Sequence, residues 1–107
     1  MEQRKAKVLV VDDSSFLRKL MVRLMAENPA IEVVGEARNG KEALELTEKL
    51  RPDVITLDIN MPVMDGLTAL KEIMNSFPTP VIMVSSLTTE DAQITFEALE
   101  KGAVEFF

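Results

Sequence analysis

The amino-acid sequence predicts an α/β fold, an open and doubly wound parallel sheet of five strands. Short apolar runs rich in β-branched residues recur along the chain, and each is bounded by turn-forming residues. The segments between these runs are amphipathic at helical spacing. With 107 residues, of which 47% are hydrophobic, the chain is long enough for one compact domain with its own core. Strands that alternate with helices favour a parallel sheet, because parallel neighbours need crossover connections.

The predicted strands are the five apolar runs. The first, AKVLVV, is nearly continuous in apolar residues, which is typical of a strand buried on both faces of a parallel sheet. Proline residues in Pro78-Thr79-Pro80 separate the fourth run from the segment before it. The predicted strands cover residues 6–11, 31–37, 54–57, 81–84 and 103–107.

Four amphipathic helices are predicted between the strands. Ser14 and Ser15 can cap the first, and Asn28-Pro29 stops it. The second is expected to follow a turn at Asn39-Gly40, and Asp65 can cap the third. Apolar residues at helical spacing cover residues 16–25, 43–50, 67–77 and 94–99.

Composition excludes several classes of function. The net charge of −6 argues against non-specific nucleic-acid binding, which needs a basic surface. Without Cys or His, the chain contains no disulfide, thiolate zinc site, Cys nucleophile or Ser-His-Asp triad. No apolar run approaches the roughly 20 residues of a membrane span, and no signal peptide precedes the first strand. We therefore expect no membrane insertion and a cytoplasmic location.

Polar residues follow three of the predicted strands directly. Asp12-Asp13 follow the first, Asp58 the third, and Ser85-Ser86 the fourth. Because parallel strands end at one edge of a sheet, where such folds bind ligands, we expect these groups to converge. Carboxylates held together repel each other unless a cation or a proton intervenes. Oxygen ligands of this kind suit Mg²⁺.

Simpler explanations exist for each residue taken alone. Asp12 to Ser15 can be only a turn and a helix N-cap, and Ser85 and Ser86 can be ordinary loop hydroxyls. Asp58 can be a helix cap, a metal ligand or a nucleophile that forms an aspartyl-phosphate. Their joint occurrence at one predicted edge of the sheet is what favours a functional site.

Three motifs carry a family resemblance across essentially the whole chain. VLVVDDS (8–14), DVITLDINMPVMDG (53–66) and PVIMVSS (80–86) resemble the receiver domain of two-component response regulators, which has a flavodoxin-like, CheY-like fold. PTPVIMVSSLT (78–88) and ALEKGAVEFF (98–107) are similar to the N-terminal regulatory domain of the chemotaxis protein-glutamate methylesterase, CheB. A stand-alone receiver of the CheY type is the alternative.

The resemblance implies a phosphoacceptor and a Mg²⁺ site. Asp58 would accept a phosphoryl group from the phosphohistidine of a sensor kinase. Asp13 and Asp58 would hold Mg²⁺ directly, and Asp12 largely through a bound water. The backbone carbonyl of Asn60 would complete the protein ligands.

The resemblance also implies a switch and a set of partners. Ser85, with Ser86 beside it, would bind the phosphoryl group, and Phe106 would be the aromatic residue that swings inward on activation. The implied partners are a chemotaxis histidine kinase, the protein's own C-terminal methylesterase domain and, through that domain, chemoreceptors. The parent protein would be an enzyme, but no esterase catalytic residue is expected in this chain.

The sequence departs from the family pattern at its end. Receivers carry a Lys just past the fifth strand, whereas this sequence stops at Phe107, and Lys101 lies too early to replace it. We therefore expect residues 1–107 to be a receiver truncated before its last helix, with part of one sheet face bare. An unphosphorylated receiver-like adaptor stays open, whereas a phospho-intermediate hydrolase would need a cap segment that 107 residues do not supply.

A basic cluster occurs on the first predicted helix, formed by Arg18, Lys19 and Arg23. A solvated surface explains it most simply. A kinase-docking face beside the acidic residues is the alternative.

Overall fold

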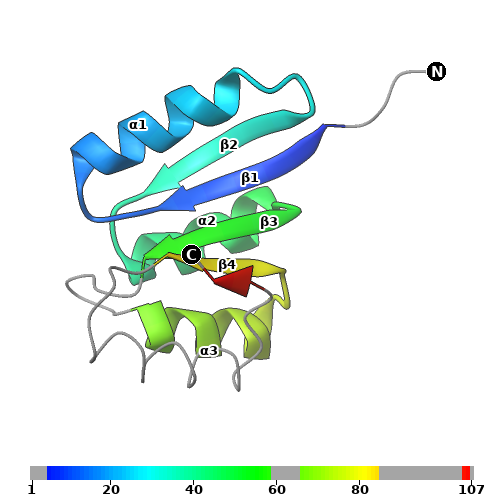
Figure 1. Cartoon of the computed structure of the whole chain (residues 1–107). Coiled ribbons are helices and arrows are strands. Elements are labelled where there is room, and N and C mark those ends of the chain that lie inside the picture. Colours follow the sequence, from blue (N-terminus) through cyan, green and yellow to red (C-terminus); the bar gives the residue numbers. More distant parts are fainter. Residues whose placement is uncertain (1–4, 59–65, 85–104, 107) are drawn as a thin grey trace.

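The fold is a parallel sheet with helices on both faces (Figure 1). The computed structural model describes residues 5–58, 66–84 and 105–106. The sheet has five strands in the order β2-β1-β3-β4-β5, and every pair of neighbours is parallel. The predicted fold class is therefore confirmed. The strands are β1 Ala6–Val11, β2 Ile31–Ala37, β3 Val54–Asp58, β4 Val81–Val84 and β5 Glu105–Phe106.

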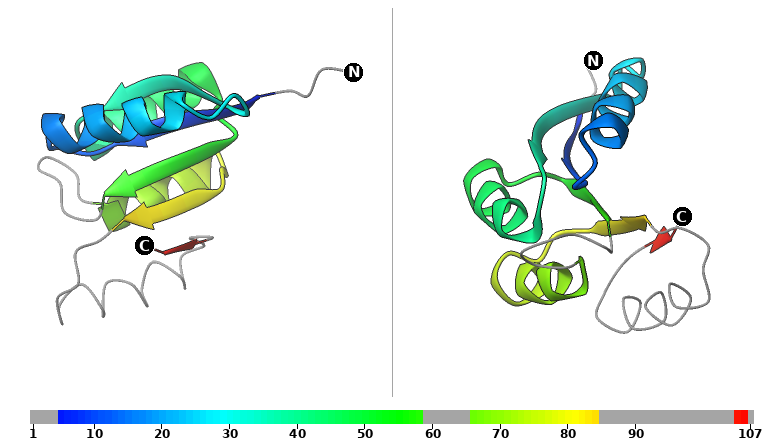
Figure 2. Two further views of the ribbon diagram at one scale, coloured as in Figure 1. Left: turned by 45° about the horizontal axis from the view of Figure 1, so that its top comes forward. Right: turned by 90° about the vertical axis from the view of Figure 1, so that its left-hand side faces the viewer.

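Three described helices cover the sheet. They are α1 Ser15–Ala26, α2 Gly40–Leu50 and α3 Gly66–Ser76. Helices α2 and α3 pack side by side on one face, and α1 lies on the other (Figure 2). The fourth predicted helix, within residues 88–102, lies outside the described residues. None of the described helices is long and apolar enough to cross a membrane.

The strand order places a switch point between β1 and β3. From β1 the chain moves outward to β2, and it then returns to the other side of β1 to form β3. Val11 pairs with Leu57, so the carboxyl ends of β1 and β3 lie level with each other. In open α/β sheets this is the position at which ligands bind.

The core lies between the sheet and the pair α2 and α3. It is built from aliphatic side chains and one methionine, as expected for a chain with five Phe and no Trp or Tyr. The residues of this cluster are Leu9, Val11, Ala37, Ala43, Ile55, Leu57, Ala69, Leu70, Ile73, Val81 and Met83.

Gly35 allows α2 to pack closely on β2. A Cβ atom added there would lie 2.8 Å from Cδ1 of Leu50 and 3.3 Å from Cδ1 of Leu9. The pairing of β1 with β2 shifts by one residue just before this position, so that Gly35 pairs with Leu9. The small residue therefore lies where the strand and the helix leave no room for a larger side chain.

Helix α1 covers its face of the sheet only in part. None of its residues is buried, and Phe16 and Leu24 are 75% and 56% exposed. An apolar groove of about 460 Å³ lies between the helix and the sheet. Met21 and Met25 are half-buried and line this groove.

Three local predictions need correction. Asn39-Gly40 is not a separate turn, because Asn39 caps α2 and Gly40 is its first residue. Asp58 is the last residue of β3 and does not merely follow it. The third helix ends at Ser76, one residue earlier than predicted.

Candidate functional site

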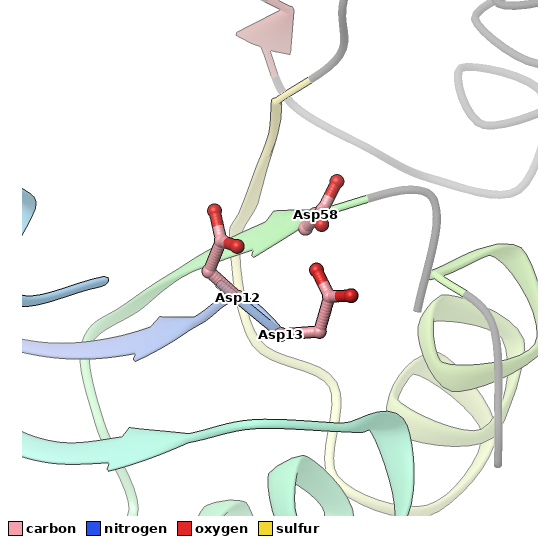
Figure 3. A group of neighbouring side chains, drawn as sticks. All are labelled: Asp12, Asp13 and Asp58. Carbon is pink, nitrogen blue, oxygen red and sulfur yellow. The ribbon is translucent and has the colours of Figure 1, made fainter. Parts of the chain in front are cut away.

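Three carboxylates meet at the carboxyl ends of β1 and β3 (Figure 3). Asp12 and Asp13 directly follow β1, and Asp58 ends β3. One carboxylate oxygen from each lies within 4.8 Å of those of the other two. The convergence expected from a parallel sheet is therefore observed, and the pairing of Val11 with Leu57 is its direct cause.

The three side chains differ in their contact with solvent. Asp12 is buried at 5% exposure, Asp58 is half-buried, and Asp13 is exposed. The cluster is therefore closed on the side of Asp12 and reached by water on the side of Asp13. A ligand can enter from solvent and still contact a carboxylate that the fold holds rigidly.

Hydrogen bonds fix Asp12 on three sides. Its N–H donates to the carbonyl oxygen of Ala37 at 3.0 Å, which extends the pairing of β1 with β2. Its Oδ1 accepts from the N–H of Ser14 at 2.9 Å, and its carbonyl oxygen accepts from Nη1 of Arg18 at 2.8 Å. The turn that carries Asp12 and Asp13 is thus well defined.

The simpler explanation of this segment is also correct. The Oγ of Ser14 accepts from the N–H of Leu17 at 3.3 Å and caps α1. The same few residues therefore start a helix and deliver two carboxylates to the edge of the sheet. Asp13 takes no part in the cap, and its carboxylate belongs to the acidic cluster.

Burial raises the pKa of Asp12 above its ordinary value. The N–H of Ser14 opposes this shift, the charge of Asp13 adds to it, and the Arg18 guanidinium opposes it again. Ionising Asp12 in the folded protein therefore costs free energy. A cation bound at the cluster would reduce that cost.

The donor set fits a hard divalent cation. All three groups offer carboxylate oxygens, and the chain has no His or Cys to bind a softer metal. Mg²⁺ is bound in proteins by a small number of carboxylates, with water and phosphate oxygens completing its coordination. The residues present therefore match the Mg²⁺ predicted from the sequence.

Comparison with known proteins decides the family. The model of the response regulator receiver domain matches residues 8–107. The chain belongs to the response regulator receiver family. The acidic cluster lies within this receiver domain, at the carboxyl edge of its sheet.

Curated relatives of this receiver bear the name protein-glutamate methylesterase/protein-glutamine glutaminase. It is 59% identical over 100 residues to a protein-glutamate methylesterase/protein-glutamine glutaminase of Photobacterium profundum, covering 94% of the chain and 25% of that protein. It is 56% identical over 103 residues to the enzyme of the same name from Pyrococcus horikoshii, covering 96% of the chain and 28% of that protein. The chain thus spans about a quarter of the length of these relatives.

Solved structures agree with this assignment. The response regulator domain of Thermotoga maritima CheB superposes with a TM-score of 0.92 at 54% identity, covering 97% of this chain and 78% of that one. A CheY from Borrelia burgdorferi, solved with CheX, BeF₃ and Mg²⁺, gives a TM-score of 0.87 at 36% identity, covering 97% and 78%. The chain is thus a CheB-like receiver domain, as its motifs predict.

Several predicted site residues are not placed by the structure. Asn60, Ser85 and Ser86 lie outside the described residues. Phe106 lies in β5, where its backbone pairs with Met83, but its side chain is not described. At the level of the backbone, β4 ends beside the site, because Val84 pairs with Asp58.

Sequence reasoning missed the role of Arg18. Its side chain is only 13% exposed, and its Nε donates to Oε1 of Glu36 at 3.1 Å. A solvated surface is therefore the wrong explanation for Arg18, although it suits Lys19, which is 66% exposed. The available signal was Glu36, an acid near the end of a mostly apolar strand, which needs a partner when the strand is covered.

Proposed function

We propose that this chain is the phospho-accepting receiver of a chemotaxis response regulator, with Asp58 as the phosphoacceptor. The observation that carries the proposal is the position of Asp58, at the end of β3 and within reach of Asp12 and Asp13. A nucleophilic carboxylate beside two further acids has a direct use for a divalent cation. Membership of the receiver family supports the same role.

The reaction is transfer of a phosphoryl group between a nitrogen and an oxygen. A carboxylate oxygen of Asp58 attacks phosphorus in the phosphohistidine of a sensor kinase. The phosphorus–nitrogen bond breaks, the imidazole leaves with the bonding electron pair, and an aspartyl-phosphate forms. Catalysis of such a step depends mainly on positioning and on electrostatic stabilisation.

The ligands proposed for Mg²⁺ are oxygens of this chain. Asp13 and Asp58 would bind it directly, Asp12 through water, and Asn60 through its backbone carbonyl. When bound, the cation supplies positive charge that offsets the carboxylates and the phosphoryl oxygens. Ser85 and Ser86 would donate hydrogen bonds to the phosphoryl group, and Phe106 would move in the switch.

The proposed output is control of a methylesterase in the cytoplasm. The relatives are about four times longer than this chain and bear the names of protein-glutamate methylesterases. Phosphorylation here would regulate a C-terminal esterase domain, and that domain would act on chemoreceptors. The greater identity to the CheB receiver, 54% against 36% for CheY, supports this assignment over a stand-alone receiver.

Titration with beryllofluoride and Mg²⁺ tests the proposal, since beryllofluoride mimics a phosphoryl group on an aspartate. Amide resonances around Asp58, Ser85 and Phe106 should shift in the wild-type chain and stay unchanged in Asp58→Ala. Asp53→Asn is the matched control, because Asp53 precedes the other end of β3 and accepts from the N–H of Lys7. Unchanged wild-type spectra, or equal shifts in Asp58→Ala, would contradict the proposal and favour an unphosphorylated adaptor.

A further inference from the structure

The Arg18 guanidinium joins the carboxyl ends of two strands beneath the acidic cluster. Its Nη1 donates to the carbonyl oxygen of Asp12 at 2.8 Å, and its Nε donates to Oε1 of Glu36 at 3.1 Å. Asp12 directly follows β1, and Glu36 lies near the end of β2. The planar fork of an arginine can serve both acceptors at once, which the ammonium group of a lysine does far less well.

The bond to Asp12 acts on the peptide unit that leads to Asp13. A peptide unit is planar, so holding its carbonyl oxygen also orients the N–H and Cα of the next residue. Among the described residues, Asp12 otherwise accepts from the backbone N–H of Ser14 and donates to the backbone carbonyl of Ala37. Within the described part of the chain, Arg18 is thus a side chain that holds the Asp12 carbonyl and can thereby orient Asp13.

Glu36 holds the guanidinium in place. Its two carboxylate oxygens accept separately from Nε of Arg18, at 3.1 Å, and from Nζ of Lys19, at 3.0 Å. The Arg18 side chain is 13% exposed, so it is held by packing as well as by its two acceptors. Because the guanidinium has so little freedom to move, it can hold a backbone carbonyl in a fixed position.

The charge of Arg18 and its hydrogen bond to the carbonyl have opposite effects on a divalent cation. As a positive charge close to the acidic cluster, Arg18 repels the cation. As a hydrogen-bond donor, Arg18 fixes the peptide unit between Asp12 and Asp13 and so keeps the two carboxylates that would bind the cation in position. The two effects can be separated, because only the second requires the planar fork.

We propose that Arg18 is a positioning residue for the divalent-cation site, acting through the carbonyl of Asp12 and held by Glu36. The inference rests on the proposed function, in which Asp12 and Asp13 bind Mg²⁺. Its effect is to favour metal binding in spite of the positive charge. Arg18 does not contact the phosphoryl group.

Arg18→Lys provides the decisive variant, since it keeps the charge and loses the fork. Its Mg²⁺ dissociation constant, measured by calorimetry and by the shift of the Ser14 amide resonance, should rise about 10-fold. Arg18→Met should weaken binding as well, although it removes a repelling charge. Arg38→Gln is the matched control, because Arg38 is 71% exposed and pairs with Glu42 on α2. Its dissociation constant should stay at the wild-type value or fall slightly.

A second measurement separates positioning from general loss of structure. Glu36→Gln keeps the shape of the side chain but weakens the hold on Arg18, and it should give an intermediate loss of Mg²⁺ affinity. For each variant, saturating Mg²⁺ should restore beryllofluoride binding at Asp58, since the defect lies in metal affinity. Circular dichroism and urea titration show which variants are folded under the conditions used.

The possible results distinguish this inference from the function on which it rests. Wild-type Mg²⁺ affinity in Arg18→Lys, or tighter binding in Arg18→Met, would overturn the positioning role and leave the phosphoacceptor site intact. A wild-type chain that binds no Mg²⁺ would overturn both. Weaker binding in Arg38→Gln, equal to that in Arg18→Lys, would also contradict positioning, because an exposed arginine that pairs with Glu42 would then matter as much as Arg18.

Discussion

At the scale of single residues, Thr56 has a buried hydroxyl that makes no hydrogen bond among the described residues. Thr56 lies in the middle of β3 at 5% exposure, and its Oγ1 has no hydrogen-bond partner within the described part of the chain. A buried hydroxyl without a partner costs free energy. The residue borders the apolar groove beside α1, where a methyl group would be better placed.

Thr56→Val is therefore expected to stabilise the chain by about 1 kcal/mol, since it removes the hydroxyl and keeps the β-branched shape. Urea denaturation measures the change. Thr47→Val is the matched control: Thr47 is also buried, but its Oγ1 donates to the carbonyl of Ala43 at 2.6 Å. That change should reduce stability, and an equal effect of the two substitutions would contradict the account.

Asp12 gives the second residue-scale prediction, which concerns pH. Burial raises its pKa in the folded protein, so the folded state binds this proton more tightly than the unfolded chain does. The contribution of Asp12 to the free energy of unfolding is therefore fully present below the pKa of the unfolded chain, about 4. It is lost as the pH rises through the higher pKa of the folded protein. Asp12→Asn should thus exceed the wild type in free energy of unfolding at pH 7 without metal.

Urea denaturation of both chains between pH 4 and pH 7 checks this, and the advantage of Asp12→Asn should shrink on acidification. Added Mg²⁺ should stabilise the wild type far more than the variant. Comparing the two chains separates the effect of Asp12 from that of groups whose pKa shifts in the other direction. Glu42 is one of these, since its pKa is lowered chiefly by the N–H of Arg38. An advantage that grows at low pH would contradict the assignment.

Side-chain chemistry decided which site residues could be predicted. Asp12, Asp13 and Asp58 were found because carboxylates directly after apolar strands are visible in the sequence. Arg18 was missed because its partner at the site is a backbone carbonyl, and such a partner leaves no trace in residue types. The burial of Asp12 depends on packing, which the sequence pattern does not describe.

At the scale of elements, strands were predicted more accurately than the start of α2. Continuous apolar runs define the strands, and β1, β2 and β4 have the predicted bounds. Asn39 is different, because asparagine serves equally well in a turn and as a helix N-cap. Here its Oδ1 accepts from the N–H of Glu42 at 2.9 Å, so Asn39 serves as the N-cap of α2.

The cap makes a testable contribution to stability. Asn39→Ala should lower the free energy of unfolding by about 1 kcal/mol, because the N–H of Glu42 loses its acceptor. Asn39→Asp keeps an acceptor and adds favourable charge at the start of α2, so it should match or exceed the wild type. Thermal or urea denaturation distinguishes them, and equal stability of all three chains would contradict the capping role.

At the scale of the whole molecule, the two faces of the sheet are covered unequally. Helices α2 and α3 enclose the core, whereas α1 has no buried residue and leaves the apolar groove accessible. The class of fold followed from the alternation of strands and helices, since parallel neighbours need crossovers. The position of the apolar groove could not be predicted from the sequence, because it depends on how α1 lies against β3 and β4.

The exposed face of α1 should bind a hydrophobic dye. An exposed apolar patch of this kind is unusual on a monomer. The 107-residue chain should therefore increase the fluorescence of anilinonaphthalene sulfonate, and Leu20→Gln combined with Leu24→Gln should reduce it while the fold is kept. Glu45→Gln, on the exposed surface of α2, is the control. Absence of dye binding by the wild type would show that the face is covered in solution.

The measurement that tests the central claim most directly is transfer of a phosphoryl group to the chain, followed by mapping of the modified residue. Incubation with a phosphorylated chemotaxis histidine kinase and Mg²⁺ should add one phosphoryl group to the chain. Treatment with base should remove this group, and the modified peptide should contain Asp58. Chelation of Mg²⁺ should stop the transfer. Modification of another residue, or undiminished transfer to Asp58→Asn, would contradict the account.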